Sequence, residues 1–348
     1  MKSIPQYAPW IRPGYGRAVA HQVDSGWVGP GEATAAFEAA LAEAVGMPFA
    51  AATTSGTAAL LIAIKALGLP RGSTILFPAY TFLAGANAAR FLGHKVRLVD
   101  IKEETLCMDP DQVEIGTDVG AVMFVNHNGY AGPDVARIKR MCAKAGVPLI
   151  EDASQGLGIR GCGTFGDVSV LSFSVPKLVT TGQGGAVLTR DASLMEQVRR
   201  LIDHGGDWRK DRVHRHIGVN FKFNDISAAF GLAQMRSLDL LRARRKRVYD
   251  GYRARLDLWP VFSNRNSDST WMMIHRAASA PAVVAALKAQ GIQAVQYYQP
   301  IAWNPPYRTR SRLPAAEAVF AQAVYLPSSL TLTLPEIQRI CRIAKSAR

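Results

Sequence analysis

Short apolar runs alternate with segments of helical periodicity through the middle of the chain, and this alternation limits the possible folds more than any other feature. The runs suited to strands are residues 74–77, 95–99, 120–125 and 147–150, and the helical segments are 81–92 and 134–145. Strands separated by helices of this length pair in parallel through right-handed crossovers. We therefore predict an α/β fold with a mostly parallel central sheet flanked by helices, and a ligand site at the carboxyl ends of the strands.

The length of the chain indicates two domains. A chain of 348 residues is longer than a domain with one hydrophobic core usually is. We predict a large domain at residues 1–238, including the N-terminal segment, and a smaller α+β domain at residues 239–348. A helix rich in arginine, within residues 236–255, is expected to join them.

The formal net charge is +14, which favours anionic partners such as nucleic acid, acidic membranes or phosphorylated small molecules. The basic residues of 236–255 have helical spacing, which is also typical of a solvated helix face. No helix-turn-helix, zinc-finger or aromatic-basic RNA motif accompanies them. We therefore expect a diphosphate-bearing small substrate rather than nucleic acid.

The apolar segments and the cysteines indicate neither a membrane span nor a metal site. The most apolar stretch, residues 58–69, is short and contains Lys65. Residues 1–16 lack the apolar core of a signal peptide. The four cysteines have no paired spacing for zinc or for disulfides. We expect a cytoplasmic protein that binds no metal.

A single lysine, Lys177, stands between two apolar runs within residues 171–189. The glycines that follow it, Gly182, Gly184 and Gly185, allow close approach of the backbone, so we predict a strand, a loop and a second strand. A lysine in such a loop can reach inward to a ligand, and its partly desolvated amine has a lowered pKa and is a better nucleophile. The alternative is an ordinary solvated lysine.

Two further motifs are suited to hold the polar groups of a ligand. In TTSGTAAL, Ser55, Gly56 and Thr57 are expected at a helix N-terminus, where N–H groups and the helix dipole bind phosphate. Such a triplet is also a common helix cap. In EDASQGLG, Asp152 directly follows an apolar strand and Gln155 stands three residues on, although an acidic residue there could simply begin a turn.

An amine, a carboxylate and a phosphate-binding helix N-terminus together match the needs of pyridoxal phosphate. Its aldehyde requires an amine to form a Schiff base, its pyridinium nitrogen requires an anion, and its phosphate requires N–H and hydroxyl donors. Each motif alone is weak. Their combination predicts pyridoxal phosphate as the cofactor.

In order along the chain, the motifs resemble those of the DegT/StrS family of sugar-nucleotide aminotransferases, which are fold-type I pyridoxal phosphate enzymes. The resemblance extends over nearly the whole chain, through SGWVGPGEATAAFE, TTSGTAAL, PAYTFLAGANA, EDASQGLG, SFSVPKLVTTGQGGAV and GVNFKFNDISAAFGLAQM. It implies an aminotransferase that moves an amino group from L-glutamate to a nucleotide-linked keto-deoxysugar. The product would be an amino sugar for a glycan, such as a lipopolysaccharide O-antigen, or for a natural product.

The resemblance assigns the catalytic roles to Lys177 and Asp152. Lys177 would join the cofactor covalently and shuttle the proton, and Asp152 would pair with the ring nitrogen. Gln155 would hydrogen-bond the ring hydroxyl.

The resemblance also implies how the rest of the cofactor is held. Gly56, Thr57 and Ser172 would hold the phosphate, and Phe82 would stack on the ring. Asn220 would reach the phosphate from the partner subunit, which implies a homodimer with shared active sites. On the residues alone, Phe82 could instead be core, Ser172 could satisfy a backbone group and Asn220 could cap a turn in its own subunit.

Contacts to the substrate are expected from Tyr298, Arg212 and His216. Lys210 and His214 are further candidates from the same polar loop, because basic side chains there could meet the phosphates of the substrate.

The chain departs from the family pattern at several positions. Gln183 stands where a glutamate is usual, and Ala302 stands in place of a histidine. Tyr297 and Tyr298 precede Gln299 and a proline, where many members have a histidine and a tyrosine. Since the small-domain positions contact sugar or nucleotide in the family, the identity of the substrate stays open.

Three alternatives remain from the sequence. A sugar dehydratase of the same family typically has histidine in place of the lysine, so Lys177 argues against it. An aminotransferase could act on a cyclitol or another cyclic ketone. A non-catalytic protein could use the basic helix to bind nucleic acid.

Overall fold

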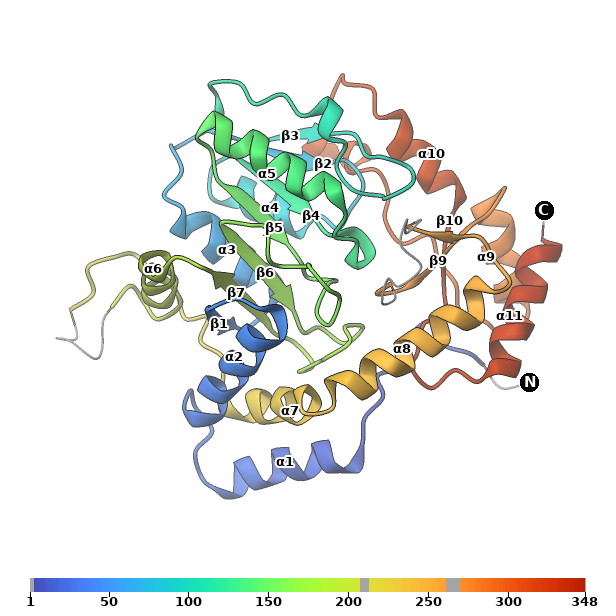
Figure 1. The fold of residues 1–348 in the computed structure, drawn as a ribbon, viewed down its shortest axis with the longest axis horizontal. Helices are drawn as coiled ribbons and strands as arrows, with labels where there is room; N and C mark the ends of the chain where they lie inside the picture. Colours follow the sequence, from blue (N-terminus) through green and yellow to red (C-terminus); the bar gives the residue numbers. More distant parts are fainter. Residues whose placement is uncertain (1–2, 207–212, 261–269, 348) are drawn as a thin grey trace.

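Two β-sheets surrounded by helices form the protein, whose computed structural model describes residues 3–206, 213–260 and 270–347. The larger sheet has seven strands in the order β1-β7-β6-β5-β4-β2-β3, and the smaller has three in the order β10-β9-β8. Figure 1 shows the larger sheet on the left and the smaller on the right, with the long helix α8 (Leu238–Arg253) between them.

Five neighbouring strands of the large sheet run parallel, from β6 through β5, β4 and β2 to β3. Strand β7 runs antiparallel to both of its neighbours, β6 and β1. The strands are β1 (Phe49–Thr53), β2 (Thr74–Pro78), β3 (Lys95–Val99), β4 (Val119–Val125), β5 (Leu149–Asp152), β6 (Val168–Ser172) and β7 (Gly185–Thr189). The prediction of a mostly parallel α/β sheet is confirmed.

Helices cover both faces of this sheet because successive strand residues point to opposite sides. In β4, Met123 packs into the core cluster beneath α3 (Gly56–Ala66), whereas Phe124 packs into the cluster beneath α5 (Pro133–Ala145). Helices α4 (Ala84–Phe91) and α6 (Ala192–Ile202) lie on the α3 side, and α2 (Glu32–Val45) and α7 (Asp225–Met235) complete the other side, with α1 (Pro13–Asp24) packed against α7. Among the described residues, no helix is both long and apolar enough to cross a membrane.

The small sheet is antiparallel and follows the arginine-rich helix. Its strands are β8 (Leu258–Trp259), β9 (Met273–Arg276) and β10 (Ala323–Leu326), and its helices are α9 (Ala280–Ala289), α10 (Pro314–Gln322) and α11 (Leu334–Ser346). Alternate residues of β9 face opposite sides here too. Met273 packs among the residues of α8, α9 and α11, whereas Ile274 shares a core cluster with the large sheet.

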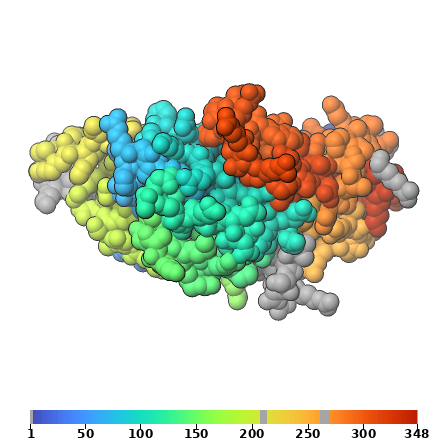
Figure 2. Space-filling view, turned by 90° about the horizontal axis from the view of Figure 1, so that it is seen from above, coloured from blue at the N-terminus to red at the C-terminus, as the bar shows by residue number. Residues whose placement is uncertain are grey.

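The two parts of the chain are also joined by polar contacts. The carboxylate of Asp100 accepts from the N–H groups of Ala315 (2.9 Å) and Ala316 (3.0 Å) at the start of α10. Figure 2 shows this side of the molecule, where orange-red atoms of the C-terminal part lie on cyan atoms of the large part. The N–H group of Ile4 donates to the carbonyl of Gly291 (3.0 Å), so the N-terminal segment contacts the part of the chain that contains the small sheet. The proposed division at residues 238 and 239 stays a prediction.

Most expected elements of the large sheet occur within one or two residues of their predicted bounds. Strand β5 is an informative difference, because it begins at Leu149 and keeps Asp152 as its last residue instead of ending before it. The N–H group of Val147 donates to the carbonyl of Cys142 at the end of α5, and Pro148 has no N–H group to donate. Regular strand pairing therefore starts only at Leu149. Asp152 is thereby fixed by the sheet itself.

A buried carboxylate, Asp225, fastens the start of α7 to the start of α2. Its oxygens accept from the N–H groups of Gly31 (2.8 Å) and Thr34 (2.9 Å) and from the Thr34 hydroxyl (2.6 Å). We expect Asp225→Ala to lower the free energy of unfolding by about 2–4 kcal/mol, because these donors stay buried without an acceptor. Urea unfolding of the cofactor-free protein measures this change.

The matched control is Asp239→Ala on α8, whose carboxylate side chain is 96% exposed and forms a 3.4 Å ion pair with Arg242. An exposed pair of this kind contributes little, so the change is expected to stay within about 0.5 kcal/mol. Equal losses in the two variants would contradict the role given to Asp225.

Candidate active site

The strand ends of the large sheet bring the predicted polar residues to one edge. Strand β5 ends at Asp152 and β6 ends at Ser172. Because β7 is antiparallel, it begins at this same edge, where Gly185 pairs with Ser172 on one side and with Thr53 on the other. Carboxyl ends of parallel strands are the usual ligand site in such sheets.

Helix α3 begins directly beyond Thr53 and directs its N-terminus at this edge. Ser55 is its N-cap, and the Ser55 hydroxyl accepts from the N–H group of Ala58 (3.0 Å). The first N–H groups of a helix have no partner within the helix, so those of Gly56 and Thr57 are suited to an anion. A helix start suited to an anion therefore lies beside Ser172, and phosphate binding there stays a prediction.

Two glycines make the close contact at this helix start possible. A Cβ atom on Gly185 would lie 2.5 Å from the carbonyl oxygen of Ser55 and 2.7 Å from the nitrogen of Gly56. A Cβ atom on Gly56 would lie 2.9 Å from the Cβ atom of Ser172. Larger residues at either position would push the helix start away from the sheet edge.

Lys177 lies in the loop between β6 and β7, as predicted, and its amine faces an aromatic ring. The Lys177 Nζ atom is 4.0 Å from the centre of the Trp271 ring. The Lys177 carbonyl accepts from the hydroxyl of Tyr7 (3.0 Å), and the Trp271 Nε1–H donates to the carbonyl of Pro176 (2.8 Å). These contacts hold the loop from two distant parts of the chain.

Burial lowers the pKa of Lys177 to about 8, although the negative charge of Asp152 acts in the opposite direction. Burial also raises the pKa of Asp152, against the opposing effects of a hydrogen bond from Ser154 and the charge of Lys177. The Ser154 N–H group donates to Asp152 Oδ1 (2.9 Å). A buried amine and a buried carboxylate thus stabilise each other's charge in one site.

Gln155 is held by hydrogen bonds at both ends of its amide. Its Oε1 accepts from the N–H group of Asn128 (2.6 Å), and its Nε2 donates to the hydroxyl of Tyr298 (3.3 Å). Gln155, Ser172 and Lys177 line a single pocket. The structure therefore brings these predicted residues together with Asp152 and the helix start.

Phe82 and Tyr298 differ in their exposure. The Phe82 side chain is 58% exposed and its ring centre lies 6.3 Å from that of Tyr298, so it is not part of the core. Tyr298 is buried among Tyr80, His127 and Tyr325. A direct contact from Tyr298 to a substrate stays a prediction.

The segment that carries Asn220 lies against the end of β1 in its own chain. The N–H group of Thr54 donates to the carbonyl of Phe221 (3.2 Å), next to the phosphate-ready helix start. Asn220, His214 and His216 are exposed on this loop. Lys210 and Arg212 fall outside the described residues.

Sequence reasoning missed three residues of the site: Tyr7, Trp271 and Arg245. Arg245 and Trp271 line the pocket with Lys177. Tyr7 comes from the N-terminal segment and Trp271 from the stretch before β9, where no motif indicated a link to Lys177. Arg245 is one of many arginines in a basic helix, so only its burial distinguishes it.

The residues of the pocket fit pyridoxal phosphate. The amine of lowered pKa suits the aldehyde, and the buried Asp152 suits a protonated ring nitrogen. The space kept open by Gly56 and Gly185 lies at helix N–H groups that suit the phosphate.

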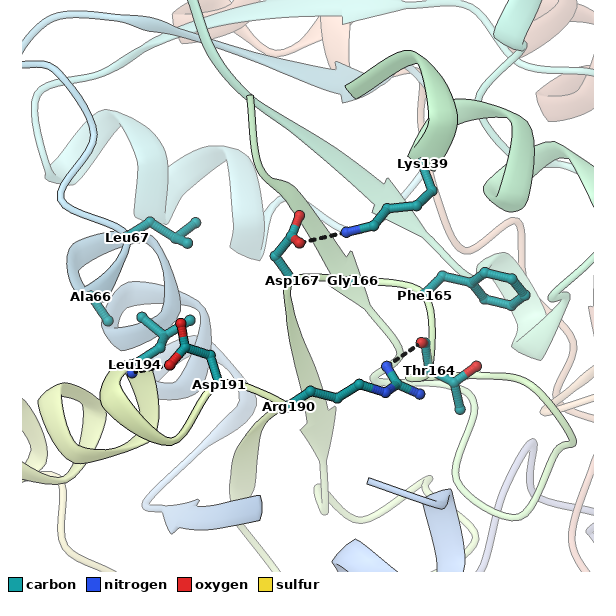
Figure 3. Close-up of a pocket in the computed structure, with 10 residues that line it drawn as sticks. All are labelled: Ala66, Leu67, Lys139, Thr164, Phe165, Gly166, Asp167, Arg190, Asp191 and Leu194. Atoms are coloured by element: carbon teal, nitrogen blue, oxygen red, sulfur yellow. Dashed lines mark hydrogen bonds and ion pairs between the residues drawn. The ribbon is translucent and has the colours of Figure 1, made fainter. Parts of the chain in front are cut away.

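A second, more open hollow lies at the opposite edge of the sheet, at the start of β6 and the end of β7 (Figure 3). Its charged groups bind within the protein: Lys139 Nζ lies 2.5 Å from Asp167 Oδ1, and Arg190 donates to the carbonyl of Thr164 (2.7 Å). Its lysine amine is already paired with Asp167, and the start of α6 beside it is capped by the carboxylate of Asp191, so we do not take it as the candidate active site.

Comparisons with known proteins agree with this geometry. The family model of the DegT/DnrJ/EryC1/StrS aminotransferase family matches residues 13–345. GDP-perosamine synthase of Caulobacter vibrioides is 30% identical over 338 residues, covering 91% of this chain and 91% of that protein. The dTDP-4-dehydro-2,3,6-trideoxy-D-glucose 4-aminotransferase of Saccharopolyspora spinosa is 30% identical over 352 residues, covering 93% of this chain and 91% of that protein.

Among solved structures, the aminotransferase TlmJ from Streptoalloteichus hindustanus superposes with a TM-score of 0.93. It is 27% identical in sequence, and the match covers 99% of this chain and 98% of that one. The matches therefore extend over 91–98% of the length of these relatives rather than over one motif.

The lowered pKa gives a direct test of the Lys177 environment. Only an unprotonated amine reacts with acetic anhydride, so the acetylation rate of Lys177 in the cofactor-free protein should rise with pH to a midpoint near 8. An ordinary lysine has its midpoint near ~10.4. Peptide mass spectrometry across a pH series measures the rate at this residue, with N-acetyl-lysine as the reference.

The variant Asp152→Asn reports the sign of the coupling. Because the charge of Asp152 raises the pKa of Lys177, its removal should move the midpoint to still lower pH. A Lys177 midpoint close to that of N-acetyl-lysine, or an upward shift in the variant, would contradict the buried amine–carboxylate pair.

Proposed function

Because the chain belongs to the DegT/DnrJ/EryC1/StrS aminotransferase family, we propose that it moves an amino group from L-glutamate to the ketone of a nucleotide-linked deoxysugar. The observation that supports this most is the Lys177 amine, which is desolvated, is influenced by the charge of Asp152 and shares a pocket with Ser172, the residue next to the start of α3. Enzymes of this family work with pyridoxal phosphate, as the name of a relative from Bacillus subtilis states.

Pyridoxal phosphate, when bound, supplies an aldehyde that accepts the amino group and a ring that withdraws electrons from the neighbouring carbon. Lys177 would hold the cofactor through its Nζ atom, and after release by the amino donor the same atom would take the proton from the donor's α-carbon. A pKa near 8 leaves part of the amine unprotonated at neutral pH, which suits both tasks.

The remaining polar residues position the cofactor in this proposal. Asp152 holds a proton on the ring nitrogen, and Gln155 donates to the ring hydroxyl with an amide that Asn128 already orients. The N–H groups of Gly56 and Thr57 and the hydroxyl of Ser172 receive the phosphate. Phe82, which is exposed at the site, covers one face of the ring.

We propose a homodimer in which Asn220 of one subunit completes the phosphate site of the other. The loop that carries Asn220 exposes apolar side chains: Ile217 is 91% exposed and Val219 is 40% exposed. Exposed apolar groups on a loop beside a ligand site favour contact with a second copy. His216 and Arg212 of the same loop are proposed to meet the phosphates of the substrate.

The nucleotide-linked substrate is proposed from the names of the relatives and from charge. One relative at 30% identity is named for a GDP-linked sugar and another for a dTDP-linked sugar. The net charge of +14 favours a diphosphate group. Since both nucleotides occur at the same identity, neither base is preferred. All four cysteines are buried thiols, which is consistent with a cytoplasmic enzyme.

A ligand panel tests this function. Purified protein loaded with pyridoxal phosphate should yield, after borohydride reduction, an adduct on the peptide that contains Lys177, and Lys177→Arg should yield none there. The loaded protein should consume L-glutamate with GDP-, dTDP- or UDP-linked 4-ketosugars. Turnover with inososes and not with any nucleotide-linked ketosugar would favour the cyclitol alternative instead.

The carboxylate has its own prediction. Asp152→Asn should reduce kcat by about 10²- to 10⁴-fold while the variant still binds the cofactor, because the ring nitrogen loses its anionic partner. Steady-state kinetics and cofactor absorbance measure the two effects separately, and the exposed Asp239→Asn serves as control. Full turnover in Asp152→Asn would show that the role assigned here is wrong.

A further inference from the structure

A second cation, Arg245, is buried at the candidate active site without an anion. It lies on the inner face of α8 and is 2% exposed. Its Nη1 donates to the carbonyl oxygen of Trp271. Its Nε and Nη2 atoms are buried and have no hydrogen-bond partner among the described residues.

Other cationic residues of the same helix form ion pairs with carboxylates. Arg242 forms an ion pair with Asp239 (3.4 Å), and Lys246 forms one with Asp250 (2.7 Å). In the described part of the chain no carboxylate forms an ion pair with Arg245; its guanidinium carbon lies 6.0 Å from the centre of the Tyr7 ring. A buried charge without a carboxylate partner destabilises a protein, and burial accordingly lowers the pKa of Arg245, although the hydroxyl of Tyr7 acts in the opposite direction.

Arg245 lines the pocket that also holds the reactive lysine. Arg245, Lys177, Ser172 and Gln155 line the same pocket. Trp271 links the two cations, since its carbonyl binds Arg245 and its ring lies 4.0 Å from the Lys177 Nζ atom. An anion bound by Arg245 would therefore stand one side chain away from the amine.

The geometry of the free atoms indicates which anion fits. Nε and Nη2 form one edge of the planar guanidinium, and their two N–H groups are the pair that binds both oxygens of a carboxylate. The phosphate of the cofactor already has its own site at the start of α3, where Gly56 and Gly185 leave room for it. The remaining anion that must approach Lys177 is the carboxylate of the amino donor.

We propose that Arg245 binds the α-carboxylate of the amino donor. This carboxylate is attached to the carbon from which Lys177 takes a proton. This inference rests on the proposed function. Arg245 is then a specificity residue: it selects amines that carry a neighbouring carboxylate and holds their α-carbon at Lys177. Binding of the donor carboxylate compensates the buried positive charge of Arg245, so the donor completes the site.

The test compares two amines on the enzyme loaded with pyridoxal phosphate. L-glutamate carries the neighbouring carboxylate and 4-aminobutyrate lacks it, and single-turnover absorbance gives the rate constant and apparent affinity for each. The wild type should prefer L-glutamate by at least about 100-fold in kcat/KM, as expected for a buried bidentate pair. Arg245→Met should reduce this preference to about 10-fold or less, mostly through apparent affinity, and Arg245→Lys should fall between them.

Two further readouts do not depend on turnover. Calorimetry with glutarate, an unreactive dicarboxylate, should detect binding to the wild type and to Lys246→Met but not to Arg245→Met. The unfolding temperature of Arg245→Met without donor should be equal to or above that of the wild type, because an apolar side chain replaces an unpaired charge. If Arg245→Met does not fold, Arg245→Lys and Arg245→Gln serve the same comparison.

The outcomes separate this inference from the proposed function. An unchanged preference for L-glutamate in Arg245→Met, with unchanged glutarate binding, overturns the inference while amino transfer stands. A loss of unfolding temperature without any loss of preference also overturns it, because it indicates a structural arginine. If the wild type converts no amino acid, the proposed function fails, and glutarate binding that depends on Arg245 still supports the carboxylate site.

Discussion

The site depends on one close contact, in which the start of helix α3 meets the ends of strands β6 and β7. Only glycine at positions 56 and 185 allows the backbone of Ser55 to approach the sheet edge, since a Cβ atom at Gly185 would lie 2.5 Å from the Ser55 carbonyl oxygen. This contact sets the positively polarised helix end beside Ser172. Asp152 then takes its place from the register of β5 with β6, and Lys177 from the loop that joins β6 to β7.

Charge in the pocket is balanced in pairs, and the balance is incomplete. The pKa of Lys177 falls through burial and the pKa of Asp152 rises, but each moderates the other. Arg245 has no such counterpart in the described part of the chain. A pocket with more buried positive than negative groups attracts anions, which agrees with an enzyme whose cofactor, proposed donor and proposed acceptor are all anionic.

Much of this could be predicted from the sequence because it is encoded locally. The continuous apolar run of β4 indicates a strand buried on both faces, and the 3.6-residue spacing in α5 indicates a helix with one buried face. The strand ends then locate Asp152 and Ser172. The rest depends on contacts between distant segments. Arg245 is buried against the carbonyl of Trp271, which lies 26 residues away in the sequence. The irregular stretch around Tyr297 and Tyr298 lacks the alternation of a strand, so its sequence does not show which tyrosine turns inward.

The segment of residues 3–10 contacts the loop that follows β6, although it lies far from that loop in sequence. The Tyr7 hydroxyl donates to the carbonyl of Lys177, and the N–H group of Ala8 donates to the Ser329 hydroxyl (2.7 Å). The N–H group of Ile4 donates to the carbonyl of Gly291. These few residues act as a strap across both sheets. Removing these residues would take away the hydrogen bond to the Lys177 carbonyl, so fusions for biochemical work are better attached after α11.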